Sequence, residues 1–284
     1  MPHDDIRIGS AASLEHEALT QLFAAAYSDY FMPMHIDAAS LQFMMDAFDF
    51  DREASRVLWL RDTPTAFAML GIRGNQGWIG GTGVPPTHRR LGLGGRAMRA
   101  ALTEAKRRGL THVGLEVLTQ NAPAIALYEQ LGFEVTRRVE VWAVATEPLA
   151  ALADASLATE CDWREAAAWI AEHRSAPEPW QRDTASLEHL ELLPPGLRAI
   201  SVGPASARRG ACVYRVTAGR CSVLQLAVSA QAEAGTAATL LATATAGAST
   251  LRWLNAPEDE PALDLLRGAG GSVETAQWEM RVAL

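Results

Sequence analysis

The chain has 284 residues, of which 49% are hydrophobic and 20% charged, and its formal net charge is −8 at pH 7. This length suffices for one large domain or two ordinary ones, and the composition is typical of a globular protein. The negative charge argues against a general nucleic-acid binder, because affinity for phosphate backbones comes from accumulated Lys and Arg. The sequence has neither an uncharged apolar run of 18 residues nor a basic start, so we expect a cytoplasmic protein without a membrane span.

The first half predicts alternating strands and helices. We expect strands at 6–8, 57–60, 66–72, 78–84, 112–118 and 133–144, and helices at 13–27, 38–48, 93–108 and after Asn121. The helix at 93–108 carries its apolar residues on one face, and Gly109 suits its left-handed C-cap. Because this helix connects strands 78–84 and 112–118, these strands are expected to be parallel neighbours.

The second half repeats this order after a linker or connecting helix at 145–158. We expect helices at 163–172 and 234–246 and strands at 197–202, 211–216, 221–228 and 251–254. The tripeptide Asn255-Ala-Pro257 repeats Asn121-Ala-Pro123 at an offset of 134 residues (255 − 121), after a strand and before a helix. A period of this length indicates a duplicated domain. We therefore predict two domains, 1–147 and 148–284.

The cysteine and histidine spacings predict neither disulfides nor a metal site. A two-residue turn at Ala218-Gly219 would place Cys221 opposite Val216. The same turn would place Cys212 opposite Gln225, so the two thiols would not pair. We expect free thiols in a reducing compartment. The seven histidines show no ligand spacing with Cys or acidic residues, so no metal is predicted.

The segment Val84-Pro-Pro-Thr-His-Arg89-Arg90-Leu-Gly92-Leu-Gly94-Gly95 follows an apolar strand and opens an amphipathic helix. It combines a rigid Pro-Pro turn, two arginines, and glycines that leave backbone N–H groups uncovered at the start of a helix. An anion bound there would meet oriented amides, the positive end of the helix dipole and Arg charge together. The segment therefore predicts a phosphate site, suited to the pyrophosphate of a nucleotide-containing cofactor.

Two patterns in the first half resemble the GNAT superfamily of acetyl-CoA-dependent N-acetyltransferases. They are Val84-x-Pro86-x-x-Arg89-Arg90-x-Gly92-x-Gly94 and Asn121-x-x-Ala124-x-x-Leu127-Tyr128-x-x-x-Gly132-Phe133. The resemblance covers roughly residues 57–142. It implies an α/β fold of the α+β type, with two domains that each have a mixed central sheet flanked by helices. It also implies transfer of an acetyl group from acetyl-CoA to an amine, on a small molecule, by direct attack in a ternary complex.

The resemblance assigns roles to individual positions. Tyr128 would be the general acid that protonates the departing CoA thiolate. Backbone groups near Val84 would pair with the pantetheine arm like an added strand, and Asn121 would contact it. The residues implied in acetyl-CoA binding are Val84, Arg89, Arg90, Gly92, Leu93, Gly94, Gly95, Arg96, Asn121 and Tyr128. The glycines at 80, 81 and 83 fit a strand that a ligand or another backbone approaches closely.

For the general base and the acceptor site, the sequence offers several candidates. Strand 78–84 offers no titratable group, so Glu116 on the next strand is a candidate base, with a hydrogen-bonded strand carboxylate as the alternative. Asp29, His35 and Asp37 in the early loop, or water, are further candidates. The acceptor site is expected to include Tyr30, Met34 and Asp37, in a loop that also holds Tyr27, Phe31 and Met32. A pocket between the two halves is the alternative.

The second half departs from these patterns. Counting from Val228 as the counterpart of Val84 puts Glu233 where Arg89 stands, with Thr236 and Ala238 in place of Gly92 and Gly94. Counting back from Gly270 puts Leu266 at the tyrosine position and Gly271 at that of Phe133. An acidic residue in the loop would repel a diphosphate. We therefore expect one acetyl-CoA site per chain and a degenerate second domain.

Two other functions are considered. A non-catalytic CoA-sensing or scaffold protein is an alternative, because no base is evident. An NAD-binding oxidoreductase is a weaker one: Gly92-x-Gly94-x-x-Ala97, followed by Glu116, formally matches a dinucleotide fingerprint. That fold needs a strand running almost into the first glycine, and Pro85–Arg90 intervenes here. We expect a monomer or homodimer without nucleic-acid or membrane partners.

Overall fold

The computed structural model describes residues 6–31, 34–152, 155–233 and 235–284. The chain divides into two compact units, Met1–Thr136 with Trp278–Leu284, and Arg137–Gln277. The predicted boundary at 147/148 differs in two ways: the division comes earlier, and the last seven residues pack in the first unit. The cause is that two long strands, β6 (Glu134–Ala145) and β12 (Ser272–Ala283), contribute residues to both units. A boundary search in the sequence assumes that each domain is one continuous segment.

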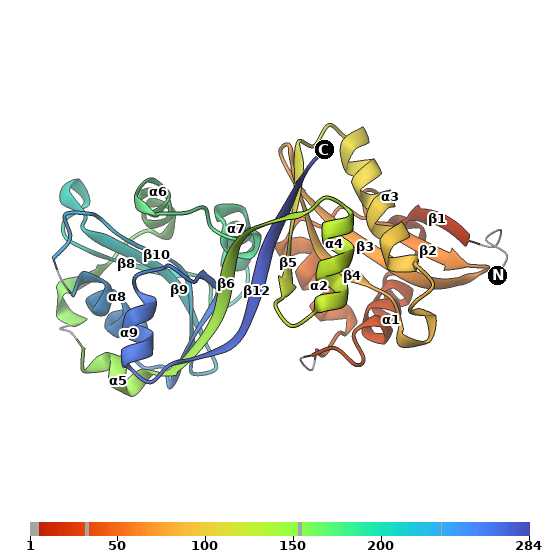
Figure 1. Ribbon diagram of the computed structural model, residues 1–284. Helices are drawn as coiled ribbons and strands as arrows, with labels where there is room; N and C mark the ends of the chain where they lie inside the picture. The colour runs from red at the N-terminus through yellow and green to blue at the C-terminus, as the bar shows by residue number, and fades with distance from the viewer. Residues whose placement is uncertain (1–5, 32–33, 153–154, 234) are drawn as a thin grey trace. The chain divides into compact units, whose positions relative to one another are not determined.

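Unit 1 alternates strands and helices as predicted (Figure 1). Its elements, besides the parts of β6 and β12, are β1 (Ile6–Ser10), α1 (His16–Ala26), α2 (Ala38–Ala47), β2 (Arg56–Leu60), β3 (Thr63–Arg73), β4 (Gln76–Gly83), α3 (Leu93–Arg107), β5 (His112–Leu118) and α4 (Ala122–Gln130). Helix α1 starts later than expected, because Ala11–Ser13 form a separate 3-10 turn.

The sheet of unit 1 is mixed. Strands β1 to β4 pair antiparallel in sequence order, and β4 pairs parallel with β5, as the connecting helix predicted. An NAD-binding fold needs a doubly wound parallel sheet, so this topology excludes the dinucleotide alternative. Helices cover both faces: Phe67 of β3 stacks on Phe23 of α1 with ring centroids 4.0 Å apart, whereas Leu70 shares a core with Met98 of α3.

A buried carboxylate anchors the end of α3. Glu104 is 6% exposed and accepts hydrogen bonds from Arg107 (2.6 and 2.8 Å) and Arg108 (2.8 Å). It also lies 2.7 Å from Nη2 of Arg56 on β2. The hydrogen bonds from Arg107, followed by those from Arg108 and the charge of Arg56, lower the pKa of Glu104 to about 2.

This cluster predicts a pH dependence of stability. The pKa of Glu104 is lower in the folded protein than the value of about 4.3 in an unfolded chain. Its stabilising effect is therefore complete above that value and lost as the pH falls through about 2. In urea denaturation, Glu104→Gln should be less stable than the wild type at pH 7. It should also lose less stability between about pH 4.5 and 2, and equal losses in both proteins would contradict the prediction.

Unit 2 repeats the order of unit 1. Its elements, besides the parts of β6 and β12, are α5 (Thr146–Ala150), β7 (Ala158–Glu160), α6 (Trp163–His173), α7 (Thr184–Glu191), β8 (Arg198–Val202), β9 (Gly210–Thr217), β10 (Arg220–Val228), α8 (Thr236–Ala244), β11 (Thr250–Pro257) and α9 (Leu263–Gly268). Strands β7 to β10 pair antiparallel in sequence order, β10 pairs parallel with β11, and β11 pairs antiparallel with β6. Helix α7 was not predicted.

One strand pairing in unit 2 differs from the sequence prediction. Cys221 lies opposite Val216 as expected, but Cys212 lies opposite Leu226 and not Gln225, because β10 has an irregularity between Val223 and Gln225. The three cysteines are nevertheless free thiols.

Asn255-Ala-Pro257 does not take the position that Asn121-Ala-Pro123 has in unit 1. Asn255 lies within β11 at φ +51° and is 1% exposed, and its Oδ1 accepts a hydrogen bond of 2.7 Å from Gln277. The next helix starts at Leu263.

Across the described residues, no helix is both long and apolar enough to cross a lipid bilayer.

Candidate functional site

The candidate site of unit 1 begins where β4 and β5 diverge. Their parallel pairing covers Gln76–Trp78 and His112–Gly114. Strand β4 then has an irregularity at Gly80 and continues to Gly83, beside β3. The glycines of this stretch make room for side chains of the core: a Cβ on Gly80 would lie 1.9 Å from the ring of Trp78, and one on Gly83 would lie 2.7 Å from Ala26. The close approach that we expected of a ligand or another backbone is made at these two glycines by side chains of the chain itself.

The loop that follows β4 presents the start of α3. Pro86–His88 form a 3-10 turn, Arg90 has φ +61°, and the N-cap Gly92 is left-handed at φ +73°. The first N–H groups of an α-helix have no acceptor within the helix, and Gly92 offers no side chain to cap them. Nothing lies within 4 Å of a Cβ built on Gly92, so the approach to the helix start is open at this residue. The geometry agrees with an anion site.

Arg89 points elsewhere. Its guanidinium forms a bidentate pair with Asp29 at 2.6 and 2.7 Å. Nε donates to the carbonyl of Val84 at 3.0 Å, and Nη2 donates to the carbonyl of Ala26 at 3.1 Å. The sequence resemblance placed this side chain at the diphosphate, whereas the structure engages it with the end of α1 and the residues after it.

Two predicted residues of the pantetheine end lie together with Tyr30. Asn121 is the N-cap of α4, with its Oδ1 3.4 Å from the backbone N of Ala124, and its side chain also bonds to the phenol of Tyr30. Tyr128 is the buried residue of α4, at 6% exposure. Burial raises the pKa of Tyr128, and the nearby phenols Tyr27 and Tyr30 raise it further. Tyr128 therefore stays protonated at neutral pH.

Glu116 is a hydrogen-bonded carboxylate on β5. Its Oε2 accepts a hydrogen bond of 2.8 Å from the indole Nε1 of Trp78. The indole is itself fixed by aromatic packing, since it stacks on Phe50 with centroids 5.6 Å apart and contacts Phe48 edge-on at 5.7 Å. This bond is the alternative that we considered for Glu116, and it does not by itself remove the residue as a base. No sequence signal linked Trp78 to Glu116, because they pair across strands that are 38 residues apart.

Asp37 and Met34 are the other two predicted acceptor residues. Asp37 is the N-cap of α2, where its carboxylate accepts from the backbone N of Ser40 at 2.7 Å. This hydrogen bond lowers the pKa of Asp37. Met34 is exposed, and Met32 lies outside the described residues. Of the three predicted acceptor residues, the structure brings Tyr30 to the Asn121 and Tyr128 side chains.

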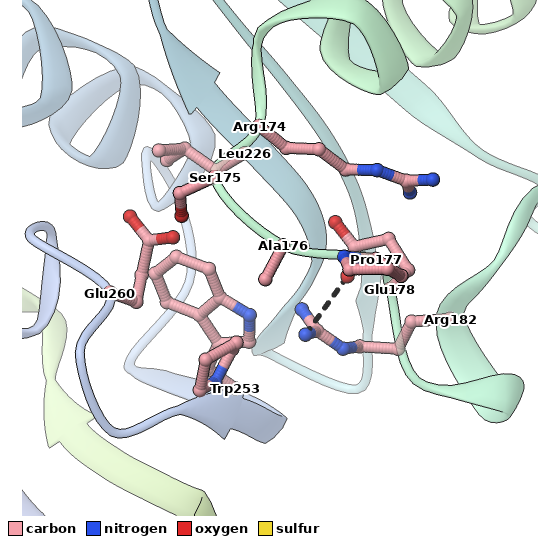
Figure 2. Close-up of a pocket in the computed structure, with 10 residues that line it drawn as sticks. Arg174, Ser175, Ala176, Pro177, Glu178, Arg182, Leu226, Trp253 and Glu260 are labelled. Carbon is pink, nitrogen blue, oxygen red and sulfur yellow. Dashed lines mark ion pairs between the residues drawn. The ribbon is translucent and has the colours of Figure 1, made fainter. Parts of the chain in front are cut away.

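In unit 2 the side chain of Arg182, labelled in Figure 2, lies where the matching strands diverge. The parallel pairing of β10 and β11 ends at Val223 and Trp253. Just beyond it, Arg182 donates from Nη1 to the carbonyl of Leu224 on β10 at 2.8 Å, and from Nη2 to that of Asn255 on β11 at 3.2 Å. The guanidinium thus bridges the two strands at the place where they stop pairing with each other.

The bridging arginine is buried with a counter-ion. Arg182 is 1% exposed, and its Nη2 lies 2.9 Å from Oε2 of Glu178. The two side chains line a small pocket beside Trp253, in which Figure 2 marks their ion pair. The residues come from the connection between α6 and α7, which the sequence analysis left unassigned. The dense polar stretch Glu178–Asp183 offered no pattern that would have predicted burial.

The loop and last helix of unit 2 test the alignment of the halves. Helix α8 has a left-handed glycine as N-cap, Gly235 at φ +98°, so Gly235 and not Thr236 matches Gly92. Leu266 does match Tyr128, because the bond from Gly271 N to Leu266 O (2.8 Å) repeats the one from Phe133 N to Tyr128 O (3.0 Å).

Residues 16–133 match the family described as the acetyltransferase (GNAT) family. The [ribosomal protein bS18]-alanine N-acetyltransferase of Escherichia coli strain K12 is 38% identical over 68 residues, which are 24% of this chain and 46% of that protein. The streptothricin acetyltransferase of Streptomyces lavendulae is 48% identical over 50 residues, 18% of this chain and 26% of that protein. The chain thus spans less than half the length of either relative.

Two solved structures resemble the whole chain. A GCN5-related N-acetyltransferase from Sphaerobacter thermophilus has a TM-score of 0.72 at 17% identity, covering 100% of this chain and 97% of that one. A tandem GNAT protein from the clavulanic acid biosynthesis pathway has a TM-score of 0.67 at 15% identity, covering 98% of each chain. At these identities the likeness concerns the fold. Residues 16–133 therefore belong to the GNAT acetyltransferase family, and the chain has the fold of a tandem GNAT protein.

Proposed function

We propose that unit 1 transfers an acetyl group from acetyl-CoA to an amine, by direct attack in a ternary complex. The observation that carries the proposal is the buried phenol of Tyr128 on α4, the helix that Asn121 caps next to Tyr30, in a chain whose residues 16–133 match the GNAT family. The relatives named above support acetyl transfer, because both are acetyltransferases by name, and the first supports the amine, because its name is that of an N-acetyltransferase. As the sequence led us to expect, we propose that this amine belongs to a small molecule.

The acyl donor would lie with its diphosphate at the start of α3. The backbone N–H groups of Leu93, Gly94 and Gly95 point along the helix toward this place, and the helix dipole adds a positive partial charge. Arg90 and Arg96, in and after the loop, add cationic side chains near the same end. Backbone groups near Val84 and the side chain of Asn121 would hold the pantetheine arm.

The reaction needs an amine nitrogen to attack the thioester carbonyl while the sulfur leaves. A C–N bond forms, the C–S bond breaks, and the proton of Tyr128 passes to the leaving thiolate. The proton lost by the amine must go to a base. We propose that Glu116 accepts it, directly or through a water, with the indole of Trp78 holding the carboxylate in place.

Unit 2 supports one acyl-CoA site per chain. Arg182 bridges the carbonyls that a pantetheine arm would need, Leu266 stands at the position of Tyr128, and Glu233 of the loop is engaged with Arg209 at 3.0 Å. None of these residues offers the chemistry of unit 1. The non-catalytic alternative rests on the lack of an evident base, and Glu116 as the proposed base answers that point.

The proposal is tested in two steps. Isothermal titration of the whole chain with acetyl-CoA should give one site per chain. Thiol release from acetyl-CoA should then be measured over a panel of amino acids, polyamines, aminoglycosides and peptides, and at least one class should stimulate release. CoA binding without any stimulated release would favour the non-catalytic alternative, and two sites per chain would contradict the assignment of unit 2.

A further inference from the structure

The guanidinium of Arg89 is committed to the chain's own groups. It forms four hydrogen bonds: two to the carboxylate of Asp29, one to the carbonyl of Ala26 and one to the carbonyl of Val84. A guanidinium has five N–H groups in a fixed planar fork, so one N–H group is left for any other partner. The side chain is fixed by this set in one orientation, toward the end of α1.

The charge of Arg89 is likewise matched within the chain. The hydrogen bond from Arg89 is the main cause that lowers the pKa of Asp29, so the carboxylate is ionised at neutral pH. A diphosphate that approached Arg89 would also approach this carboxylate, and like charges repel. Both side chains are about half exposed, at 43% and 50%, so the pair contributes little to global stability. Its bidentate geometry fixes position more than it adds energy.

Asp29 belongs to a short segment that touches several parts of the proposed acyl-donor site. Tyr27, the C-cap of α1, donates its phenol to the carbonyl of Thr82 on β4 at 3.2 Å. Tyr30 bonds to the side chain of Asn121, and its backbone N donates to the carbonyl of Tyr27 at 3.1 Å. Residues 26–30 therefore contact the end of β4, the loop after it and the N-cap of α4.

We propose that Arg89 is a positioning residue, which holds residues 26–30 over the acyl-donor site through Asp29, and that it is not a ligand of the diphosphate. The inference rests on the proposed function, since it takes unit 1 to be the acyl-CoA site. The start of α3 then holds the diphosphate without Arg89. The segment that Arg89 holds includes Tyr30, which is a predicted acceptor residue. The Arg89–Asp29 pair would therefore also position the side of the site that the amine contacts.

The test uses the whole chain with CoA as the probe and compares Asp29→Asn, Arg89→Gln and the double variant. Titration calorimetry should give CoA affinities within about threefold of the wild type in all three. Hydrogen exchange of the amides at 27–31 should be roughly two- to tenfold faster in each single variant, the factor expected for one lost hydrogen bond. The double variant should exchange no faster than the singles, because both remove the same contact.

Two further variants separate charge from geometry. Arg89→Lys keeps the charge but not the fork, so it should exchange like Arg89→Gln. Arg90→Gln is the matched control, expected to weaken CoA binding and to leave exchange at 27–31 unchanged. With any amine that stimulates thiol release, Asp29→Asn should raise the KM for the amine and leave the KM for acetyl-CoA unchanged.

The opposite results would overturn the inference. If Arg89→Gln weakens CoA binding by about tenfold or more while Asp29→Asn does not, Arg89 is a diphosphate ligand. If neither variant changes exchange at 27–31, the pair does not hold the segment. A wild-type chain that binds no CoA contradicts the proposed function instead, and the exchange measurement still decides whether Arg89 positions the segment.

Discussion

Tyr128→Phe should lower the kcat of acetyl transfer by a factor of about 10²–10⁴, the usual contribution of a general acid. The substitution removes one hydroxyl from a side chain that is 6% exposed and keeps the ring that packs on Phe133 at 5.9 Å. The fold and the acyl-donor site should therefore survive. The affinity for acetyl-CoA should stay within about threefold, because the phenol acts on the leaving sulfur in the transition state.

The chain offers matched controls for this experiment. Burial also raises the pKa of the partly buried Tyr27 phenol, but its hydroxyl donates a hydrogen bond to the carbonyl of Thr82. Tyr27→Phe should lose less than about tenfold in kcat. Steady-state kinetics by thiol release would compare both variants, with the affinity for acetyl-CoA measured by calorimetry. A Tyr128→Phe enzyme with normal kcat, or a larger loss in Tyr27→Phe, would reassign the general acid.

Arg182→Met should destabilise the protein by about 3–5 kcal/mol, as is typical when one partner of a buried ion pair is removed. Glu178 would then lie buried without the guanidinium 2.9 Å away, and the carbonyls of Leu224 and Asn255 would lose their donor. Urea denaturation followed by circular dichroism measures the loss.

A double variant separates the effect of an unpaired buried charge on stability from the effect of lost packing volume. Arg182→Met with Glu178→Leu removes both charges and keeps apolar volume, so it should recover most of the loss. The exposed pair of Arg164 and Glu188 (2.6 Å) is the control, and Arg164→Met should cost about 1 kcal/mol or less. If Arg182→Met is no less stable than Arg164→Met, the bridging role is wrong.

Local signals in the sequence predicted most of the elements correctly. Asn121 caps α4 and Gly92 precedes α3 in the left-handed conformation, as the motif spacing indicated. These features depend on residues a few positions apart, so short sequence patterns are enough to predict them. The same reasoning failed for Asn255, whose tripeptide has the letters of a cap but lies in a strand. Whether such a tripeptide ends a strand or continues it depends on pairing with distant strands, which short sequence patterns do not record.

Side-chain direction was harder to predict. The motif identified Arg89 as a loop cation, but its partner Asp29 is 60 residues away, and only the packing of α1 beside β4 brings the two together. Glu116 was recognised as a strand carboxylate, but its bond to Trp78 depends on the alignment of two strands. Arg182 had no signal at all.

The sequence by itself determined the alternation of strands and helices, the left-handed Gly92 before α3 and the cap of α4 at Asn121, because each follows from periodicity or short spacing. The tertiary structure decided where the units divide, since β6 and β12 each serve both. It also decided that the guanidinium of Arg89 pairs with Asp29 of the same chain. A guanidinium takes the carbonyls and carboxylates that distant segments bring within reach, and that proximity is a property of the fold.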